Sequence, residues 1–167
     1  LGRRVMPGRQ RARGVRSPVP DRYCELERFG QKTGSGYFKY EKGDRTPIPD
    51  AEVEKIIVDV STQMGITRRA ISDQEILQRL LYPMVNEGAK ILEEKIAIRA
   101  SDIDVIWVYG YGWPVYRGGP MFWADQIGLR ALRDKMLEFQ KASGDAFWAP
   151  AQLLNRLADE GKGFTRQ

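Results

Sequence analysis

The side chains that most often carry out enzyme chemistry are scarce in this sequence. Its 167 residues include no His, and Cys24 is the only Cys. Because His is the commonest general base and the commonest metal ligand, its absence removes both roles at once. Carboxylates alone make a poor zinc site, since zinc prefers nitrogen and sulfur ligands. We therefore predict no catalytic residue and no metal ligand in this chain, and we interpret Cys24 as an inert thiol.

One pair of carboxylates invites a chemical interpretation. Asp102 and Asp104 lie in the segment SDIDVIWVYG, and a metal site or an acid–base pair would use two such groups. Side chains two positions apart on a helix do not face each other, however. Ser101 is a suitable N-cap, Gly110 is a suitable end, and an Asp in the first turn is favoured by the helix dipole. We therefore expect a short helix in which both carboxylates are structural.

A glycine-rich segment, RFGQKTGSGYFKY at residues 28–40, offers a second candidate site. Its three glycines permit sharp turns with positive φ before Tyr37 and Phe38 pack on a core. A phosphate-binding loop is the functional alternative, but such a loop should follow a strand and open into a helix. Pro47 and Pro49 follow here instead, so we expect a linker. A similar Gly-x-Gly-aromatic pattern recurs near the C-terminus in EGKGF, as if each pattern closed a helical repeat.

The densest feature is the segment YGYGWPVYRGGPMFW at residues 109–123, with four glycines, two prolines and six aromatic residues. Pro120 is placed to be the first residue of a helix after a tight Gly-Gly turn. One interpretation is a loop folded over its own aromatic side chains. The other is an exposed aromatic surface for a partner or an apolar ligand. For the second interpretation, the candidate interface or acyl-binding residues are Tyr109, Tyr111, Trp113, Tyr116, Arg117, Phe122 and Trp123.

The elements that would position these residues are all helical. Apolar residues recur at i, i+3, i+4 and i+7 spacing in several segments, and no segment shows the alternation of a strand. Pro83 lies inside the longest segment and should kink it. The sequence therefore predicts an all-α fold. The expected helices span residues 50–64, 73–98, 101–110 and 129–144, and a last helix opens at Pro150.

The net charge of +5 is concentrated at one end of the chain. Residues 1–22 carry seven Arg and one Asp, whereas the remainder carries 20 basic and 21 acidic residues. The first segment has no helical or strand period and is expected to be a disordered basic arm. An arm that binds nucleic acid or a membrane surface is the alternative, but no aromatic side chains are interleaved to stack on bases. We predict neither nucleic acid nor membrane as a partner of the body.

Four blocks in the same order resemble one protein family. They are RFGQKTGSGYFKYE, LLYPMVNEGAKILEE, ASDIDVIWVYGYGWP and YRGGPMFWAD. They resemble the C-terminal part of the multifunctional enoyl-CoA hydratase/3-hydroxyacyl-CoA dehydrogenases of fatty-acid β-oxidation, over roughly residues 23–164. The resemblance implies a helical domain like the C-terminal domain of 6-phosphogluconate dehydrogenase. In such enzymes, a crotonase domain and a Rossmann domain precede two helical repeats of this kind.

The same resemblance implies that catalysis takes place outside this chain. A His–Glu pair in the Rossmann domain removes the proton of the 3-hydroxyl group of an acyl-CoA, and hydride passes to NAD. This sequence has no His and no strand–GxGxxG–helix unit. We therefore expect no cofactor in this chain, and NAD only in the full-length enzyme. The alternative is a free-standing acyl-CoA or protein-binding module that reuses the fold.

One residue distinguishes the two repeats implied by the resemblance. The first repeat of the family opens with Asn-Arg-Leu-Leu, whereas here Gln78 replaces the Asn. We therefore assign residues 23–49 to the tail of the first repeat with a linker, and residues 50–167 to the second repeat. The expected partners are the Rossmann domain, the first repeat and a second copy of the chain, with acyl-CoA as a further candidate. Because the chain ends in Phe-Thr-Arg-Gln and looks closest to bacterial enzymes, we expect a cytoplasmic location.

Overall fold

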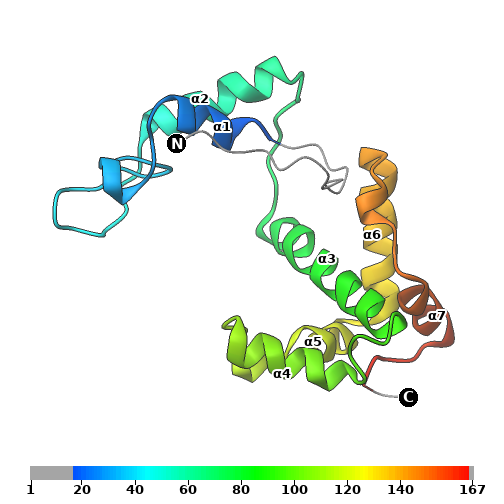
Figure 1. Ribbon diagram of the computed structural model, residues 1–167. Coiled ribbons are helices and arrows are strands. Elements are labelled where there is room, and N and C mark those ends of the chain that lie inside the picture. The colour runs from blue at the N-terminus through cyan, green and yellow to red at the C-terminus, as the bar shows by residue number, and fades with distance from the viewer. Residues whose placement is uncertain (1–16, 166–167) are drawn as a thin grey trace. The chain divides into compact units, whose positions relative to one another are not determined.

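The computed structural model describes residues 17–165 and confirms the all-α fold (Figure 1). Within that range, the extended backbone forms isolated bridges only, near residues 30–48, and no strand. The described residues divide into two compact units, 17–70 and 71–165. No helix among them is both long and apolar enough to cross a membrane.

The N-terminal unit is built on two helices, α1 (Val19–Glu25) and α2 (Ala51–Gln63). Asp50 caps α2 by accepting a hydrogen bond from the backbone N–H of Glu52, which confirms the predicted start of this helix. The core of the unit consists of side chains from both helices, namely Tyr23, Val53, Ile56 and Val60. Because α1 begins at Val19, the predicted arm over residues 1–22 overlaps a helix; residues 1–16 of that arm lie outside the described residues.

A buried arginine holds the glycine-rich segment between these helices, which contains the short 3-10 helix η1 (Gln31–Thr33). Arg28 forms an ion pair with Asp50 and donates to Glu52 at 2.8 Å and to the carbonyl of Gly36 at 3.1 Å. The predicted positive φ is present at Gly30 and Gly34, at 88° and 74°, but not at Gly36. No strand precedes this segment within the described residues, so its geometry is that of a turn anchored by Arg28.

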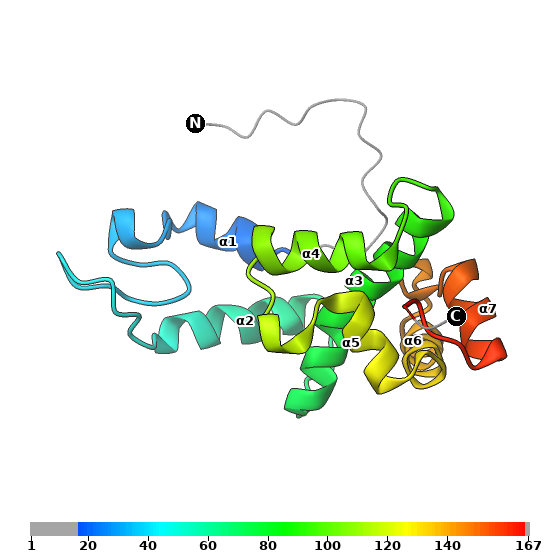
Figure 2. The same ribbon diagram turned by 90° about the horizontal axis from the view of Figure 1, so that it is seen from below.

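The C-terminal unit contains five helices around one core. They are α3 (Asp73–Glu93), α4 (Ala100–Gly110), α5 (Pro120–Ile127), α6 (Leu129–Ser143) and α7 (Gln152–Glu160). Helix α3 packs against α5 and α7, and α4 and α5 lie side by side in both views (Figures 1 and 2). The largest fully buried side chains are Val85, Met121, Leu132, Met136 and Leu154. This core fixes the surfaces that α4, α5 and α7 present.

Several predicted helix boundaries are wrong by a few residues. Helix α3 ends at Glu93 rather than at residue 98, and the chain then turns through Lys95 at φ 59°. Helix α4 begins at Ala100, so that its N-cap is Arg99 and not the predicted Ser101. The carboxylate of Asp102 accepts a hydrogen bond from the backbone N–H of Arg99 at 3.1 Å and stabilises this start. Helix α7 begins two residues after the predicted Pro150.

The first half of α3 also differs from its predicted packing. Ile76, Leu77 and Leu80 belong to the apolar spacing that predicts this helix, yet they are 44%, 55% and 62% exposed. The buried residues of α3 all lie between Tyr82 and Ala89, where the other helices contact it. The apolar period therefore identifies the helix correctly, but half of its apolar face has no covering element within this unit.

The two Gly-x-Gly patterns have the same local geometry. Gly34 and Gly161 end short helices in the left-handed conformation, at φ 74° and 67°. The second glycine of each pair has no room for a side chain: a Cβ on Gly36 would lie 2.8 Å from the Cα of Gly30, and one on Gly163 would lie 2.6 Å from the Cγ of Asp125. The break between the compact units at residues 70/71 lies after the predicted repeat boundary at residue 50, and the assignment of repeats stays a prediction.

Candidate interaction surface

The aromatic segment is held in place by a carboxylate from the preceding helix. Asp104 of α4 is 6% exposed and accepts the backbone N–H groups of Met121 at 2.7 Å and Phe122 at 3.1 Å. These N–H groups belong to the first turn of α5, where backbone N–H groups have no acceptor within the helix. Asp104 therefore caps α5 from a neighbouring helix and joins α4 to α5.

This cap requires glycine at the turn before α5. Gly119 has φ 98°, and a Cβ there would lie 2.3 Å from the Cβ of Asp104. Gly118 has φ 75° and ends the short 3-10 helix η2 (Val115–Arg117) in the left-handed conformation. Pro120 occupies the first position of α5, as predicted. The Gly-Gly-Pro sequence thus lets the chain pass directly against the carboxylate that caps the next helix.

Three indoles of the segment and of α4 pack together toward the core. The rings of Trp113 and Trp123 lie 5.9 Å apart in an edge-on arrangement, and Trp107 lies 6.4 Å from Trp113. Tyr82 of α3 contacts Trp123 with ring centroids 6.2 Å apart. Trp113 is 9% exposed. This half of the segment confirms the interpretation of a loop folded over its own aromatic side chains.

A second set of side chains from α4 and the same loop points into solvent. Tyr109, Tyr111 and Tyr116 are 85%, 70% and 84% exposed. On α4, Tyr109 continues an apolar stripe with Val105 and Ile106, because residues at i, i+1 and i+4 lie on one side of a helix. We define the α4–η2 surface by these residues and their exposed neighbours: Val105, Ile106, Tyr109, Tyr111, Val115 and Tyr116.

The predicted interface residues therefore separate into two groups. Trp113 is buried and Trp123 is half-buried, so neither indole forms the main exposed area. Phe122 is 40% exposed and lies against Gly118. The guanidinium of Arg117 lies 5.4 Å from the ring of Tyr116 and covers part of it. Sequence reasoning missed Val105, Ile106 and Val115. The spacing of Val105 and Ile106 from Tyr109 on a helix could have indicated these two residues, whereas Val115 lies in the separate helix η2.

The two carboxylates of α4 have pKa values that shift in opposite directions, each with a structural cause. Burial raises the pKa of the Asp104 carboxyl, although hydrogen bonds from Met121 and Phe122 act in the opposite direction. The guanidinium of Arg99 holds the pKa of Asp102 below its usual range. Asp102 and Asp104 thus have separate structural partners, as predicted. Among residues 17–165, no group of three acidic or sulfur side chains is arranged to hold a metal.

Comparisons with known proteins agree with this architecture. Residues 76–166 match the family model of the 3-hydroxyacyl-CoA dehydrogenase C-terminal domain. The chain is 41% identical over 157 residues to the peroxisomal bifunctional enzyme of Danio rerio, and the match covers 93% of this chain and 22% of that protein. The chain is 40% identical to the human peroxisomal bifunctional enzyme, and that match also covers 93% of this chain and 22% of that protein. The chain therefore spans about a fifth of the length of these relatives.

A solved structure extends the agreement to three dimensions. The dehydrogenase part of multifunctional enzyme 1 from C. elegans matches with a TM-score of 0.61 and 27% sequence identity. That match covers 83% of this chain and 32% of the other. The family model, the curated relatives and the solved structure all correspond to the family that the four sequence blocks resemble. The chain belongs to the 3-hydroxyacyl-CoA dehydrogenase C-terminal domain family.

Proposed function

We propose that this chain acts as the C-terminal helical domain of an NAD-dependent 3-hydroxyacyl-CoA dehydrogenase of fatty-acid β-oxidation. In this role it packs against the domains that bind NAD and the acyl-CoA, and it supports the substrate cleft without performing hydride transfer itself. The observation that carries the proposal is the match of residues 76–166 to the 3-hydroxyacyl-CoA dehydrogenase C-terminal domain. The α4–η2 surface, with three tyrosines that are more than two-thirds exposed, provides an area for packing against the other domains.

Packing, rather than chemistry, accounts best for this surface. Large aromatic side chains dominate the energetics of protein interfaces, and apolar groups gathered in water favour association. Asp104 holds the frame by two backbone hydrogen bonds, so the surface is ordered before a partner arrives. Arg99 and Asp102, at the N-terminal end of α4, form an ion pair with each other, and the guanidinium of Arg117 lies against the ring of Tyr116. A docking role needs nothing further from the chain, whereas a dehydrogenase needs a base and a dinucleotide site.

The direct test is an activity assay on the chain alone. Incubation with NAD and a 3-hydroxyacyl-CoA should produce no NADH above a blank without protein, because the chain contains no His to accept the hydroxyl proton. A sample of heat-treated chain serves as a second control for contaminating enzyme. Turnover that follows the chain through purification would contradict the supporting role.

A second candidate function is a free-standing acyl-CoA or protein-binding module. The exposed tyrosines favour it equally, since they suit an acyl tail as well as a protein surface. This function would be favoured if the isolated chain bound an acyl-CoA at Tyr109 and Tyr116, and if adding a dehydrogenase partner left the affinity for that acyl-CoA unchanged. The cytoplasmic location expected from the sequence stays a prediction, and the relatives named above are peroxisomal.

A further inference from the structure

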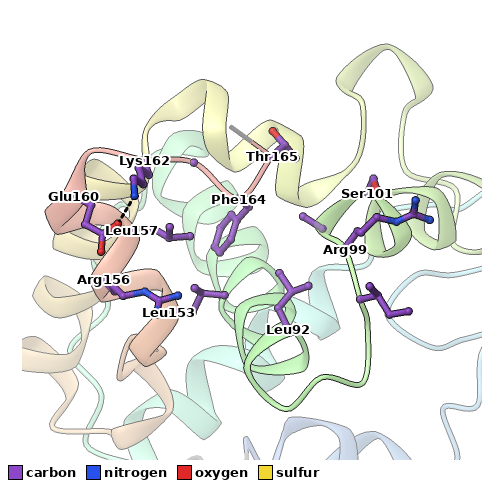
Figure 3. Close-up of a pocket in the computed structure, with 13 residues that line it drawn as sticks. Leu92, Arg99, Ser101, Leu153, Arg156, Leu157, Glu160, Lys162, Phe164 and Thr165 are labelled. Atoms are coloured by element: carbon purple, nitrogen blue, oxygen red, sulfur yellow. Dashed lines mark ion pairs between the residues drawn. The ribbon is translucent and has the colours of Figure 1, made fainter. Parts of the chain in front are cut away.

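A cavity of about 900 Å³ opens in the C-terminal unit, apart from the α4–η2 surface. Its walls come from the end of α3, the first turn of α4, helix α7 and residues 162–165 (Figure 3). Binding sites for small molecules commonly have volumes of about 300–1,000 Å³. The cavity is therefore large enough for a ligand of that class.

The floor of the cavity is apolar. The side chains of Leu92, Leu153, Leu157 and Phe164 gather toward its centre (Figure 3). Leu157 and Phe164 are 8% and 9% exposed, so they form a continuous part of the core beneath. Ile98 lines the same cavity and is 90% exposed, which leaves apolar area in water that a ligand would cover. An aliphatic chain suits such a floor.

The rim of the cavity is predominantly basic. It carries Arg99, Arg156 and Lys162, and Glu160 is the one acid among the thirteen lining residues. Asp102 pairs with Arg99 at 2.8 Å, and Glu160 pairs with Lys162 at 3.0 Å. Arg156 is exposed and forms no ion pair with any of the residues that the structure describes. Its guanidinium is therefore available for an anion.

The C-terminal wall is preformed. Asp125 accepts the backbone N–H groups of Phe164 at 2.7 Å and Thr165 at 2.8 Å, and also the hydroxyl of Thr165. The absence of a side chain on Gly163 allows this close approach, because a Cβ would lie 2.6 Å from the Cγ of Asp125. A wall that is already ordered lowers the entropic cost of binding.

We propose that this cavity binds a single-chain anionic amphiphile. The aliphatic tail lies on the floor formed by Leu92, Leu153, Leu157 and Phe164, and a carboxylate or phosphate head is held by Arg156, with Lys162 beside it. The proposal is independent of the dehydrogenase role, because all of its residues lie within this chain and no dinucleotide takes part.

Calorimetric titration of the whole chain tests this proposal with four probes below their micelle concentrations. Decanoate and decyl phosphate combine the tail with each head, decanol lacks the charge and butyrate lacks most of the tail. We expect both anionic amphiphiles to bind, and a preference between them identifies the head. Decanol should bind about two- to fivefold more weakly, as expected for loss of one exposed ion pair. Butyrate should bind at least about tenfold more weakly, because each buried methylene contributes about 0.8 kcal/mol.

Two matched variants separate the specific site from general charge attraction. Arg156→Ala should weaken decanoate binding about two- to fivefold, whereas Lys141→Ala removes the same charge from α6, outside the cavity, and should leave it unchanged. Both residues are exposed, so neither change threatens folding. The proposal is overturned if decanoate does not bind, if decanol binds as tightly as decanoate, or if the two variants behave alike.

Discussion

At the scale of single residues, the close contact between Gly119 and Asp104 in the C-terminal unit leaves no room for a side chain at residue 119. An added Cβ would both occupy the space of the Asp104 side chain, at 2.3 Å, and force a non-glycine residue to φ 98°. Relieving the clash means moving the carboxylate that caps α5. Asp104 is one of the two aspartates that the sequence predicts to be structural. Its position explains why the chain has a glycine at residue 119, directly before Pro120.

The substitution Gly119→Ala should therefore destabilise the chain by at least about 2 kcal/mol, from left-handed strain and overpacking combined. Chemical denaturation followed by circular dichroism measures the effect. Gly110→Ala is the matched control, because nothing lies within 4 Å of its added Cβ and its φ is not positive. The control should change stability by less than about 1 kcal/mol. Equal effects of the two substitutions would contradict the close contact.

A second residue-scale prediction concerns acid stability of the N-terminal unit. The guanidinium of Arg28 holds the pKa of Asp50 below its ordinary value, despite the opposing effect of burial. A carboxyl whose pKa is depressed on folding contributes stability above its unfolded pKa of about 3.9, and that contribution is lost as the pH falls through the lower, folded value. Thermal unfolding of this unit should therefore move to lower temperature as the pH falls below about 4.

The variant Asp50→Asn tests the cause of this acid sensitivity. It removes the titrating group, so part of the pH dependence below about 4 should disappear. Stability near neutral pH should also fall, because Arg28 is then buried with a weaker partner. Asp59, an exposed residue of α2 in the same unit that is not a hydrogen-bond partner of Arg28, provides the control variant Asp59→Asn, which should leave the acid transition unchanged. If Asp50→Asn left the acid transition unchanged, Arg28 would not be the source of the depression.

At the scale of elements, one buried amide connects α3 to the segment before α7. Asn86 is 2% exposed, donates to the carbonyl of Ala149 at 3.0 Å and accepts the N–H of Ala151 at 2.7 Å. Asn86→Ala leaves both backbone groups without a partner and should cost about 1–3 kcal/mol in free energy of unfolding. Asn155→Ala, which removes one long contact of 3.4 Å, should cost less. The reverse order in urea unfolding would contradict this role.

The α4–η2 surface makes a prediction about association. The double variant Tyr109→Ser, Tyr116→Ser removes two side chains that are 85% and 84% exposed, so folding should be preserved. Self-association, measured by sedimentation velocity at several concentrations, should weaken by at least about tenfold, because interface tyrosines commonly contribute 1 kcal/mol or more each. Leu137→Ser, on α6 and 43% exposed, is the control. A chain that is monomeric at every concentration would contradict this use of the surface.

The helices could be predicted from sequence because their signals are local. The apolar spacing of Val53, Ile56 and Val60 and the cap at Asp50 depend on residues within one or two turns, and the structure confirms them. The exact start of α4 could not be predicted from such signals. Arg99, rather than Ser101, occupies the cap position, and its backbone N–H donates to the carboxylate of Asp102. The separation of the aromatic segment into buried indoles and exposed tyrosines also escaped prediction, since it depends on α3 and α5 packing around Trp113 and Trp123.

The cavity beside α7 illustrates the same limit. Asp125 and Gly163 are 38 positions apart, and their contact follows from the packing of α5 against the C-terminal segment. The Gly-x-Gly pattern alone indicated a turn at this point. It did not indicate that the turn forms one wall of a cavity lined by Arg156 and Phe164.

At the scale of the whole molecule, we propose that the chain supports a dehydrogenase and does not perform the reaction itself. The family match, the lack of His and the exposed α4–η2 surface all favour a supporting role for this chain, with catalysis in other domains of the enzyme. A domain that stabilises a partner should raise the partner's activity by mass action, since its binding shifts the partner toward the competent state. The effect should saturate with increasing chain concentration.

The most direct measurement is a complementation titration. The peroxisomal bifunctional enzyme of Danio rerio, with the region matched by this chain removed, is assayed for NADH formation from a 3-hydroxyacyl-CoA while the chain is added. Its own removed region is the positive control, and the Tyr109→Ser, Tyr116→Ser variant is the negative one. We predict no turnover by the chain alone, a saturable increase in the activity of the truncated enzyme, and loss of that increase with the variant. Turnover by the chain alone, or no increase where the enzyme's own region restores activity, would contradict the account.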